Sequence, residues 1–301
     1  MEGHVTKHVS CIYHLAELNT EQIRSLDRDR TAVLIPGGIL EEHGPFLPCS
    51  TDTHTSERLT SDLADAIVRR PGWSVLIFPT IPLGHGGANG IGGKDVFPGT
   101  YTVRATTLRA VFMDLASELG EQGFRWIFIV NHHFPPNDHN RALHQACAYF
   151  NDVYGGKMVH LMGLVDFSIL DGVLTAEDQK TAGIDIHAGA LETSWMLAFH
   201  PNLVDPAYKQ AVTQSGETWE ELKRMASAPD WPGYVGAPAL AKASYGTALA
   251  EKISATVIAL ALSILGGEDV DAAAGNDFTP LQDLGWAERK QQEWLEKNGL
   301  K

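Results

Sequence analysis

Three side chains suited to metal binding follow an apolar run near the start of the chain. Glu41 and His43 are two residues apart, and Asp52 lies nine residues further on. Carboxylates and imidazoles are ligands for zinc, manganese and iron. The glycines and prolines between them fit a non-repetitive loop in which the three side chains can converge. The segment 41–52 is therefore a candidate part of a metal site.

A second polar segment follows another apolar run. Residues 131–140 contain His132, His133 and His139 together with Asp138. A lone histidine in a loop is usually solvated, but three at the end of a strand favour a ligand role. This segment can supply the donor that the first one lacks.

A third candidate is the pair His187 and Glu192. Positions five apart on a helix point about 140° apart, so one continuous helix would not place both on one face. We therefore expect His187 just before a helix and Glu192 in its first turn or two. The pair could act as a general acid or base or bind metal, and the alternative is a capping stretch with an exposed glutamate.

The elements that must position these residues alternate between strand and helix. Short apolar runs alternate with segments that place apolar residues at helical spacing. Strands are expected at 31–35, 73–81, 125–130 and 157–164, and helices at 54–70, 103–120, 138–150, 187–200 and 246–265. Such alternation predicts an α/β fold with a mostly parallel sheet covered on both faces. Ligands bind at the carboxyl ends of such strands, so the first two polar segments should face one crevice.

The other segments carry weaker signals. Residues 172–185 are rich in turn formers and predict a surface excursion, and residues 203–245 contain prolines and tryptophans typical of an irregular lid or interface. We expect a single domain over 1–270. The tail 271–301 should form a short amphipathic helix that packs on the domain or on a neighbouring subunit.

Bulk composition limits the possible functions. Of 301 residues, 44% are hydrophobic and 20% charged, as in a globular protein, and the net charge of -14 argues against nucleic-acid binding. Three widely spaced cysteines argue against a disulfide framework. No signal-peptide pattern opens the sequence, and no run approaches the roughly 18 apolar residues of a membrane span. We expect a cytoplasmic protein with no membrane partner.

Four ordered motifs resemble the creatininase family of metal-dependent amidohydrolases. They cover most of the chain, from about residue 13 to about residue 265. The motifs are Glu41-x-His43-Gly44-Pro45-x-Leu47-Pro48 with Asp52, Phe97-Pro98-Gly99-Thr100, Asn131-x-His133, and His187-Ala188-Gly189-x-x-Glu192-Thr193-Ser194.

The resemblance implies a three-layer α/β/α sandwich, usually hexameric, that binds a small-molecule substrate. It implies one or two divalent metal ions per chain, zinc first and manganese or iron as alternatives, and hydrolysis of an amide-type C–N bond by a metal-activated water. Carried over by position, the metal ligands are Glu41, His43, Asp52, His133 and Glu192, with Asp52 as the bridge. The catalytic pair is His187 and Glu192.

Three positions depart from the family pattern. Pro135 stands where some members have a glutamate ligand, so the second metal would be held by Glu192, His139 or Asp138, or be absent. Phe46 replaces a common histidine, and Glu42 replaces the usual glutamine. The substrate contacts should therefore differ, and creatinine itself is not assigned as the substrate.

Other residues suggest substrate contacts or other chemistry. Phe46, His139, Lys94 and Trp231 are candidate substrate-binding residues. The glycine-rich run 84–94 fits no nucleotide-binding motif and predicts a flexible active-site loop. Cys49 has no identifiable base beside it, and no Gly-x-Ser-x-Gly elbow is present.

The sequence therefore favours a metal-dependent hydrolase of a small cyclic amide, formamide or related compound. A metal-dependent isomerase or lyase on the same site, and a non-catalytic metal-binding homologue, remain alternatives.

Overall fold

The computed structural model describes residues 10–133, 137–268, 278–282 and 285–300. Pro135 and the extreme N-terminus, on which two of the sequence expectations rest, lie outside these residues.

A five-stranded parallel sheet forms the centre of the fold. Its order is β1-β3-β2-β4-β5, and every neighbouring pair is parallel. The strands are β1 (Ile12–His14), β2 (Thr31–Pro36), β3 (Ser74–Ile77), β4 (Trp126–Val130) and β5 (Lys157–His160). The predicted α/β fold with a parallel sheet is confirmed.

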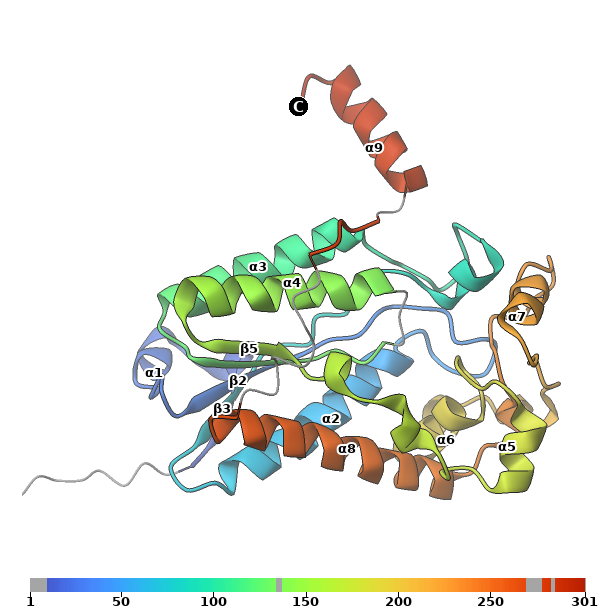
Figure 1. Cartoon of the computed structure of the whole chain (residues 1–301), viewed down its shortest axis with the longest axis horizontal. Helices are drawn as coiled ribbons and strands as arrows, with labels where there is room; N and C mark the ends of the chain where they lie inside the picture. The colour runs from blue at the N-terminus through green and yellow to red at the C-terminus, as the bar shows by residue number, and fades with distance from the viewer. Residues whose placement is uncertain (1–9, 134–136, 269–277, 283–284, 301) are drawn as a thin grey trace, which may run out of the picture.

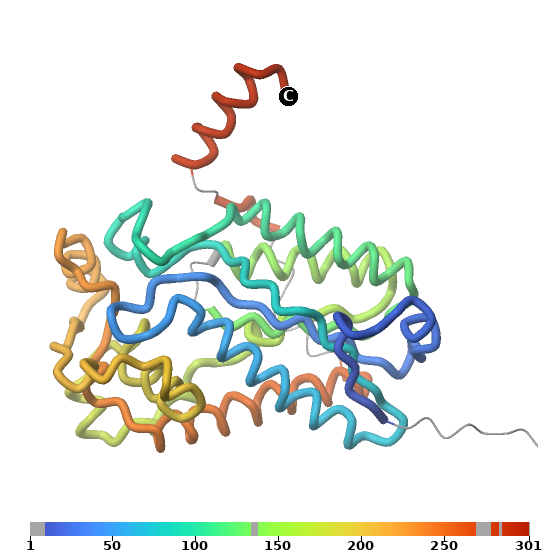
Figure 2. The backbone as a smooth tube through the Cα atoms, turned by 180° about the vertical axis from the view of Figure 1, so that it is seen from behind, coloured from blue at the N-terminus to red at the C-terminus, as the bar shows by residue number. Residues whose placement is uncertain are grey.

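Helices cover both faces of this sheet. Figures 1 and 2 show α3 (Ala105–Glu121) and α4 (Asn137–Tyr154) on one face, and α2 (Thr51–Val68) and α8 (Ala243–Leu265) on the other. Side chains alternate along a strand, and Leu34 of β2 joins the core under α2 and α8 while its neighbour Val33 joins the core under α3 and α4. This is why the strands read as continuous apolar runs rather than as alternating ones.

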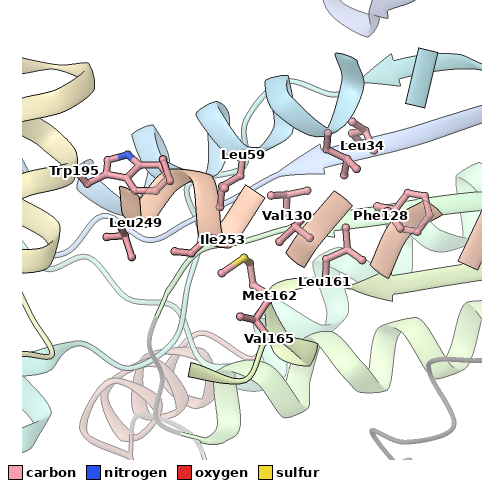
Figure 3. Close-up of a cluster of buried hydrophobic side chains, with 14 of the residues drawn as sticks. Leu34, Leu59, Phe128, Val130, Leu161, Met162, Val165, Trp195, Leu249 and Ile253 are labelled. Atoms are coloured by element: carbon pink, nitrogen blue, oxygen red, sulfur yellow. The ribbon is translucent and has the colours of Figure 1, made fainter. Parts of the chain in front are cut away.

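The larger core lies between the sheet and the layer of α2 and α8. Figure 3 shows Leu34, Phe128 and Val130 from the strands facing Leu59 of α2 and Ile253 of α8. These side chains are at most 2% exposed, so the helices are fixed against the sheet by dry packing. The helix α6 (Ala190–Phe199) joins the same core through Trp195.

Several predicted boundaries were wrong. Helix α2 begins at Thr51 rather than at residue 54, so Asp52 lies in its first turn and not in the preceding loop. The segments predicted as irregular contain α5 (Ala176–Ala182) and α7 (Trp219–Ala226). Near the N-terminus, Asn19 caps α1 (Thr20–Arg24) through a capping box.

Short 3₁₀ turns complete the connections. They are η1 (Leu15–Glu17), η2 (Ala88–Gly92), η3 (Met162–Leu164), η4 (Phe167–Leu170), η5 (Pro201–Leu203), η6 (Pro206–Gln210) and η7 (Pro238–Leu240).

Helix α8 corrects one expectation from composition. By length and composition alone it could cross a membrane, with a mean hydropathy of 1.8. One of its sides packs on α2 and α6, and 39% of the most apolar 18-residue stretch of the helix is buried in the protein. The apolar character of α8 is therefore accounted for at least in part by core packing.

Helix α9 (Gly285–Lys297) stands away from the domain in Figure 1. None of its residues is buried, and Trp294 is 58% exposed. Its docking on the domain or on a neighbouring subunit stays a prediction.

Candidate metal centre

The ends of two adjacent strands create the site. β2 pairs directly with β4, and both lead into polar segments at the same edge of the sheet. The chain leaving β2 makes a close approach to α2 at Gly38, where an added Cβ would lie 2.8 Å from the Thr53 nitrogen and the φ angle is +139°. Only glycine fits there, and this places Glu41 and His43 beside the first turn of α2.

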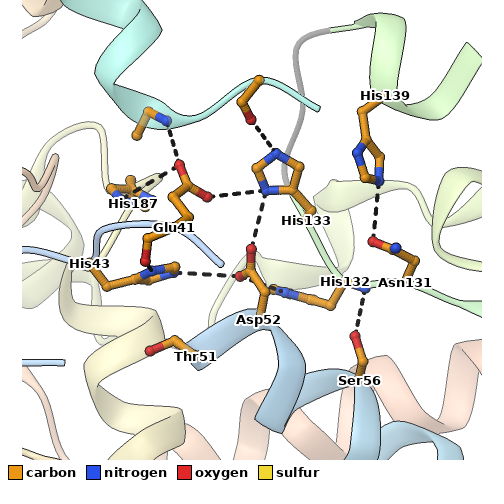
Figure 4. A network of polar contacts seen from close by, with 12 residues as sticks. Glu41, His43, Thr51, Asp52, Ser56, Asn131, His132, His133, His139 and His187 are labelled. Carbon is orange, nitrogen blue, oxygen red and sulfur yellow. Dashed lines mark hydrogen bonds and ion pairs between the residues drawn. The ribbon is translucent and has the colours of Figure 1, made fainter. Parts of the chain in front are cut away.

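Two groups of potential ligands share one aspartate. Glu41, Asp52 and His133 form one group, and His43, Asp52 and Glu192 form the other, with the donor atoms in each within 4.8 Å of one another. His133 Nδ1 is 3.2 Å from Asp52 Oδ2, and His43 Nε2 is 3.5 Å from Asp52 Oδ1. Figure 4 shows four of these side chains, those of Glu41, His43, Asp52 and His133, converging from the two polar segments and α2. Asp52 could therefore contribute to two neighbouring cation sites.

Backbone carbonyls fix which nitrogen of each imidazole faces the centre. Nδ1 of His43 is 3.1 Å from the carbonyl oxygen of Glu41, and Nε2 of His133 is 2.6 Å from that of Gly86. A carbonyl can only accept, so these nitrogens carry protons, and the other ring nitrogen of each imidazole faces the carboxylates. Nε2 of His43 is buried and has no hydrogen-bond partner among the described residues. A divalent metal would satisfy this atom, and the donor set therefore fits the ion that it implies.

The pKa shifts of His43 and Asp52 indicate that the centre favours positively charged groups. Burial alone would lower the pKa of His43, but the carboxylates of Glu192, Asp52 and Glu41 raise it to about 10. Burial would raise the pKa of Asp52, yet contacts with three imidazoles, His43 among them, hold it well below its usual range. The centre thus stabilises anionic carboxylates and attracts cations.

The start of α6 brings the third polar segment to the same centre. His187 lies just before the helix, and Glu192 lies in its first turn, as predicted. Oε2 of Glu192 is 3.7 Å from His43 Nε2 and accepts the backbone N–H of Ala188 at 2.5 Å. Ala188 has a φ angle of 49°, which is uncommon for a residue other than glycine. The backbone between His187 and Glu192 is held in this conformation while the two side chains reach the centre from one side.

Comparison with known proteins identifies the family. A model described as creatininase, creatinine amidohydrolase, matches residues 16–261. The chain belongs to the creatininase family. It is 28% identical over 202 residues to a mycofactocin precursor peptide peptidase of Mycobacterium ulcerans, a match that covers 63% of this chain and 67% of the relative. It is 26% identical over 194 residues to a creatinine amidohydrolase of Pseudomonas putida, with 58% and 66% covered. The chain thus spans about two thirds of these curated relatives.

Solved creatininase structures share the fold. A creatininase with Mn superposes with a TM-score of 0.64 at 19% identity, covering 84% of this chain and 98% of the other. A creatininase mutant of Zn–Zn type gives a TM-score of 0.59 at 20% identity, covering 84% and 97%. At this identity the likeness concerns the fold.

Buried histidines behind the centre support this creatininase-type site. Nδ1 of His132 lies 3.4 Å from Asp52 Oδ1, a contact that sequence reasoning did not single out. His139 is fully buried, its Nδ1 accepts the backbone N–H of His85, and its Nε2 is 3.2 Å from Asn131 Oδ1. Both ring nitrogens of His139 are therefore engaged, and its geometry favours a supporting role over the predicted substrate contact.

The other candidate substrate residues, Phe46, Lys94 and Trp231, belong to none of the ligand groups. Phe46 packs against Tyr234 at a ring distance of 5.9 Å. Nζ of Lys94 donates to the carbonyl of Ala228 at 2.7 Å and lies 5.0 Å from the ring centre of Trp231. Lys94 and Trp231 thus brace the glycine-rich segment against the end of α7.

The glycine-rich segment contributes backbone groups rather than side chains. The N–H of Ala88 donates to Glu41 Oε1, and the carbonyl of Gly86 contacts His133. Every residue carries the same backbone groups, so these two contacts could not be predicted from the sequence. The same holds for Asp185, which accepts the N–H groups of Ala190, Leu191 and Ala237 and anchors the start of α6.

Proposed function

We propose that this creatininase-family protein is a metal-dependent amidohydrolase that cleaves a C–N bond in a small amide, such as a cyclic amide or a formamide. The observation that carries the proposal is the sharing of Asp52 by two groups of potential ligands, in which every residue except Glu192 is buried. A shared carboxylate is the usual way to hold two metal ions near one water molecule and one substrate carbonyl.

In this proposal Glu41, His43, Asp52, His133 and Glu192 hold one or two divalent ions. Zinc is the first expectation, with manganese or iron as alternatives. Bound metal supplies Lewis acidity, which lowers the pKa of water and polarises a carbonyl group. Pro135 stands where some family members have a glutamate ligand. In the second ligand group, Glu192 would provide the carboxylate that is missing there.

Glu192 and His187 are the proposed acid–base pair. The side chain of Glu192 is 16% exposed and the most accessible of the potential ligands, so it can take a proton from water at the edge of the centre. Amide cleavage requires protonation of the leaving nitrogen. Burial would lower the pKa of His187, but the neighbouring carboxylates of Glu41 and Glu42 raise it to about 9, which keeps a proton available on its ring.

A peptide is a second candidate substrate, because one relative of similar identity is described as a peptidase. A metal-dependent isomerase or lyase, or a non-catalytic metal-binding protein, could use the same centre. Hydrolysis of either an amide or a peptide differs from an isomerase or lyase reaction, because hydrolysis incorporates oxygen from solvent into the product.

Elemental analysis of the purified protein should find about one to two divalent ions per chain. The loaded protein is then assayed against cyclic amides, formamides and short peptides in ¹⁸O-labelled water. Glu192→Gln and His187→Ala should lose turnover, while Glu177→Gln on the exposed face of α5 serves as the matched control. Full turnover by metal-free protein, or unchanged turnover in both site variants, would overturn the proposal.

A further inference from the structure

An apolar hollow lies at the end of the molecule opposite to the metal centre. It measures about 300 Å³ and is formed by η1, α1, β3 and the last turns of α3. Figure 1 shows α1 far from α6, the helix that carries Glu192. Leu15, Ile23, Phe78 and Leu115 line the hollow and are only partly buried. Because protein interiors are normally packed without voids of this size, an apolar ligand could remove this surface from water.

Arg28 ties two walls of the hollow together. Its Nη1 donates to the carbonyl of Ile23 and its Nε to the carbonyl of Gln122, both at 2.9 Å. Its guanidinium carbon lies 4.3 Å from the centre of the Phe124 ring. Ile23 of α1 lines one side of the hollow, and Gln122 and Phe124 at the end of α3 line the other. These contacts fix α1 against the end of α3, so the hollow belongs to a braced structure.

The mouth of the hollow carries negative charge. Glu118 and Gln122 lie one helical turn apart, are both exposed, and are the polar residues of the lining. Among the described residues, the Glu118 carboxylate has no ion pair or hydrogen bond. The C-terminal end of a helix attracts cations, yet the last turn of α3 contains no basic residue. The mouth therefore favours a cationic N–H donor over an anion.

We propose that this hollow binds a small amine, a molecule with an apolar aromatic or aliphatic body and a cationic amino group. The body lies among Leu15, Ile23 and Leu115, and the ammonium group donates to Glu118 and to the side-chain oxygen of Gln122. The volume is at the lower end of the roughly 300–1,000 Å³ of ligand pockets, so the ligand is small. This site is separate from the metal centre and does not depend on the proposed hydrolysis.

The test compares phenethylamine with phenylacetate, which carry the same ring and opposite charges. Each is titrated into metal-loaded protein labelled with ¹³C in the methyl groups of isoleucine and leucine. The NMR signals of Leu15 and Ile23 report binding in the hollow. The signal of Leu47, in the segment that contains Glu41 and His43, reports binding at the metal centre.

Three variants accompany wild type. Leu115→Trp fills the hollow, Glu118→Gln removes the charge at its mouth, and Asp114→Asn is an exposed control on the same helix. Circular dichroism checks that each variant folds. Glu118→Gln changes only an exposed side chain, so it keeps the test decisive if Leu115→Trp fails to fold.

Phenethylamine should shift the signals of the hollow in wild type and Asp114→Asn, and should bind more tightly than phenylacetate. Leu115→Trp should weaken this binding at least about tenfold, because the apolar body loses its place. Glu118→Gln should weaken phenethylamine by about 2- to 5-fold, since an exposed ion pair contributes little, and should not weaken phenylacetate.

Four results would each overturn the inference. They are shifts at Leu47 without shifts in the hollow, equal binding of the two probes to wild type, undiminished phenethylamine binding in folded Leu115→Trp, and undiminished binding in Glu118→Gln. Sedimentation adds a further check, because loss of self-association in folded Leu115→Trp would mean that a second copy of the chain, and not an amine, occupies the hollow.

Discussion

Replacing Asp185 should weaken both the fold and the metal centre, although this residue contacts neither metal ligands nor substrate in our assignment. Its Oδ2 accepts the N–H of Ala190 at 2.6 Å and of Ala237 at 3.0 Å, and its Oδ1 accepts the N–H of Leu191 at 3.2 Å. Helix α6 has no side-chain cap at Gly189, so Asp185 satisfies its first N–H groups from a distance.

The expected magnitude follows from these three bonds. A hydrogen bond contributes about 1 kcal/mol net, so Asp185→Ala should lower the free energy of unfolding by about 3 kcal/mol. Asp185→Asn keeps one acceptor oxygen and should lose about half of that. Asp166→Ala removes an exposed aspartate whose side chain accepts the N–H of Ser168, and it should cost no more than about 1 kcal/mol.

The effect should extend to metal binding because α6 carries Glu192. Ala188, with its uncommon positive φ angle, lies between Asp185 and Glu192 in the chain. Loss of the Asp185 bonds would free the start of α6 and let Glu192 move away from His43. Zinc affinity of Asp185→Ala should fall by about 10- to 100-fold, as when other groups that orient ligands are removed. Urea unfolding gives the stability and competition with a zinc chelator gives the affinity. If Asp185→Ala matches Asp166→Ala in both measurements, the anchoring role is wrong.

Two further predictions concern the whole centre and its surroundings. Removing metal with a chelator should lower the unfolding temperature, and added zinc should restore it, since an ion at about 1,000 times its Kd stabilises by roughly 4 kcal/mol; equal unfolding of the two forms would count against a built metal site. Burial and the neighbouring His144 lower the pKa of His160 to about 3, below the 6.5 of an ordinary histidine. Below pH 6.5 the unfolded chain therefore binds a proton at His160 that the native state does not bind. As the pH falls from 6.5 towards 3, the free energy of unfolding should decrease by up to about 1.4 kcal/mol per pH unit. Urea unfolding of His160→Asn should show a shallower loss over this window, and a slope identical to wild type would contradict the assignment.

Sequence reasoning located the site through the sheet. Apolar runs ending at 35 and 130 predicted two parallel strands, and such strands end at one edge. The structure pairs β2 with β4 directly, so Glu41 and His133 meet although about 90 residues separate them. The family motifs then supplied residue roles that spacing alone could not.

What the sequence could not supply depends on tertiary contacts. The N–H of Ala88, the carbonyl of Gly86 and the three bonds of Asp185 involve backbone groups, which every residue carries. Helix α7 was missed for another reason: prolines and tryptophans around it suggested irregular structure, and the local capping signal of Thr218 three residues before Glu221 was overlooked. Only a folded chain reveals which such groups meet.

The misplaced start of α2 has a consequence for the chemistry. In a loop, Asp52 would need neighbours to hold its position. In the first turn of α2 it is fixed by a helix whose other side packs in the core, and it lies where the helix dipole favours negative charge. Contacts with His132, His133 and His43 lower its pKa further against the effect of burial. Asp52 is therefore held in place and ionised in the metal-free protein, as the proposed role of a carboxylate shared by two metal ions would require.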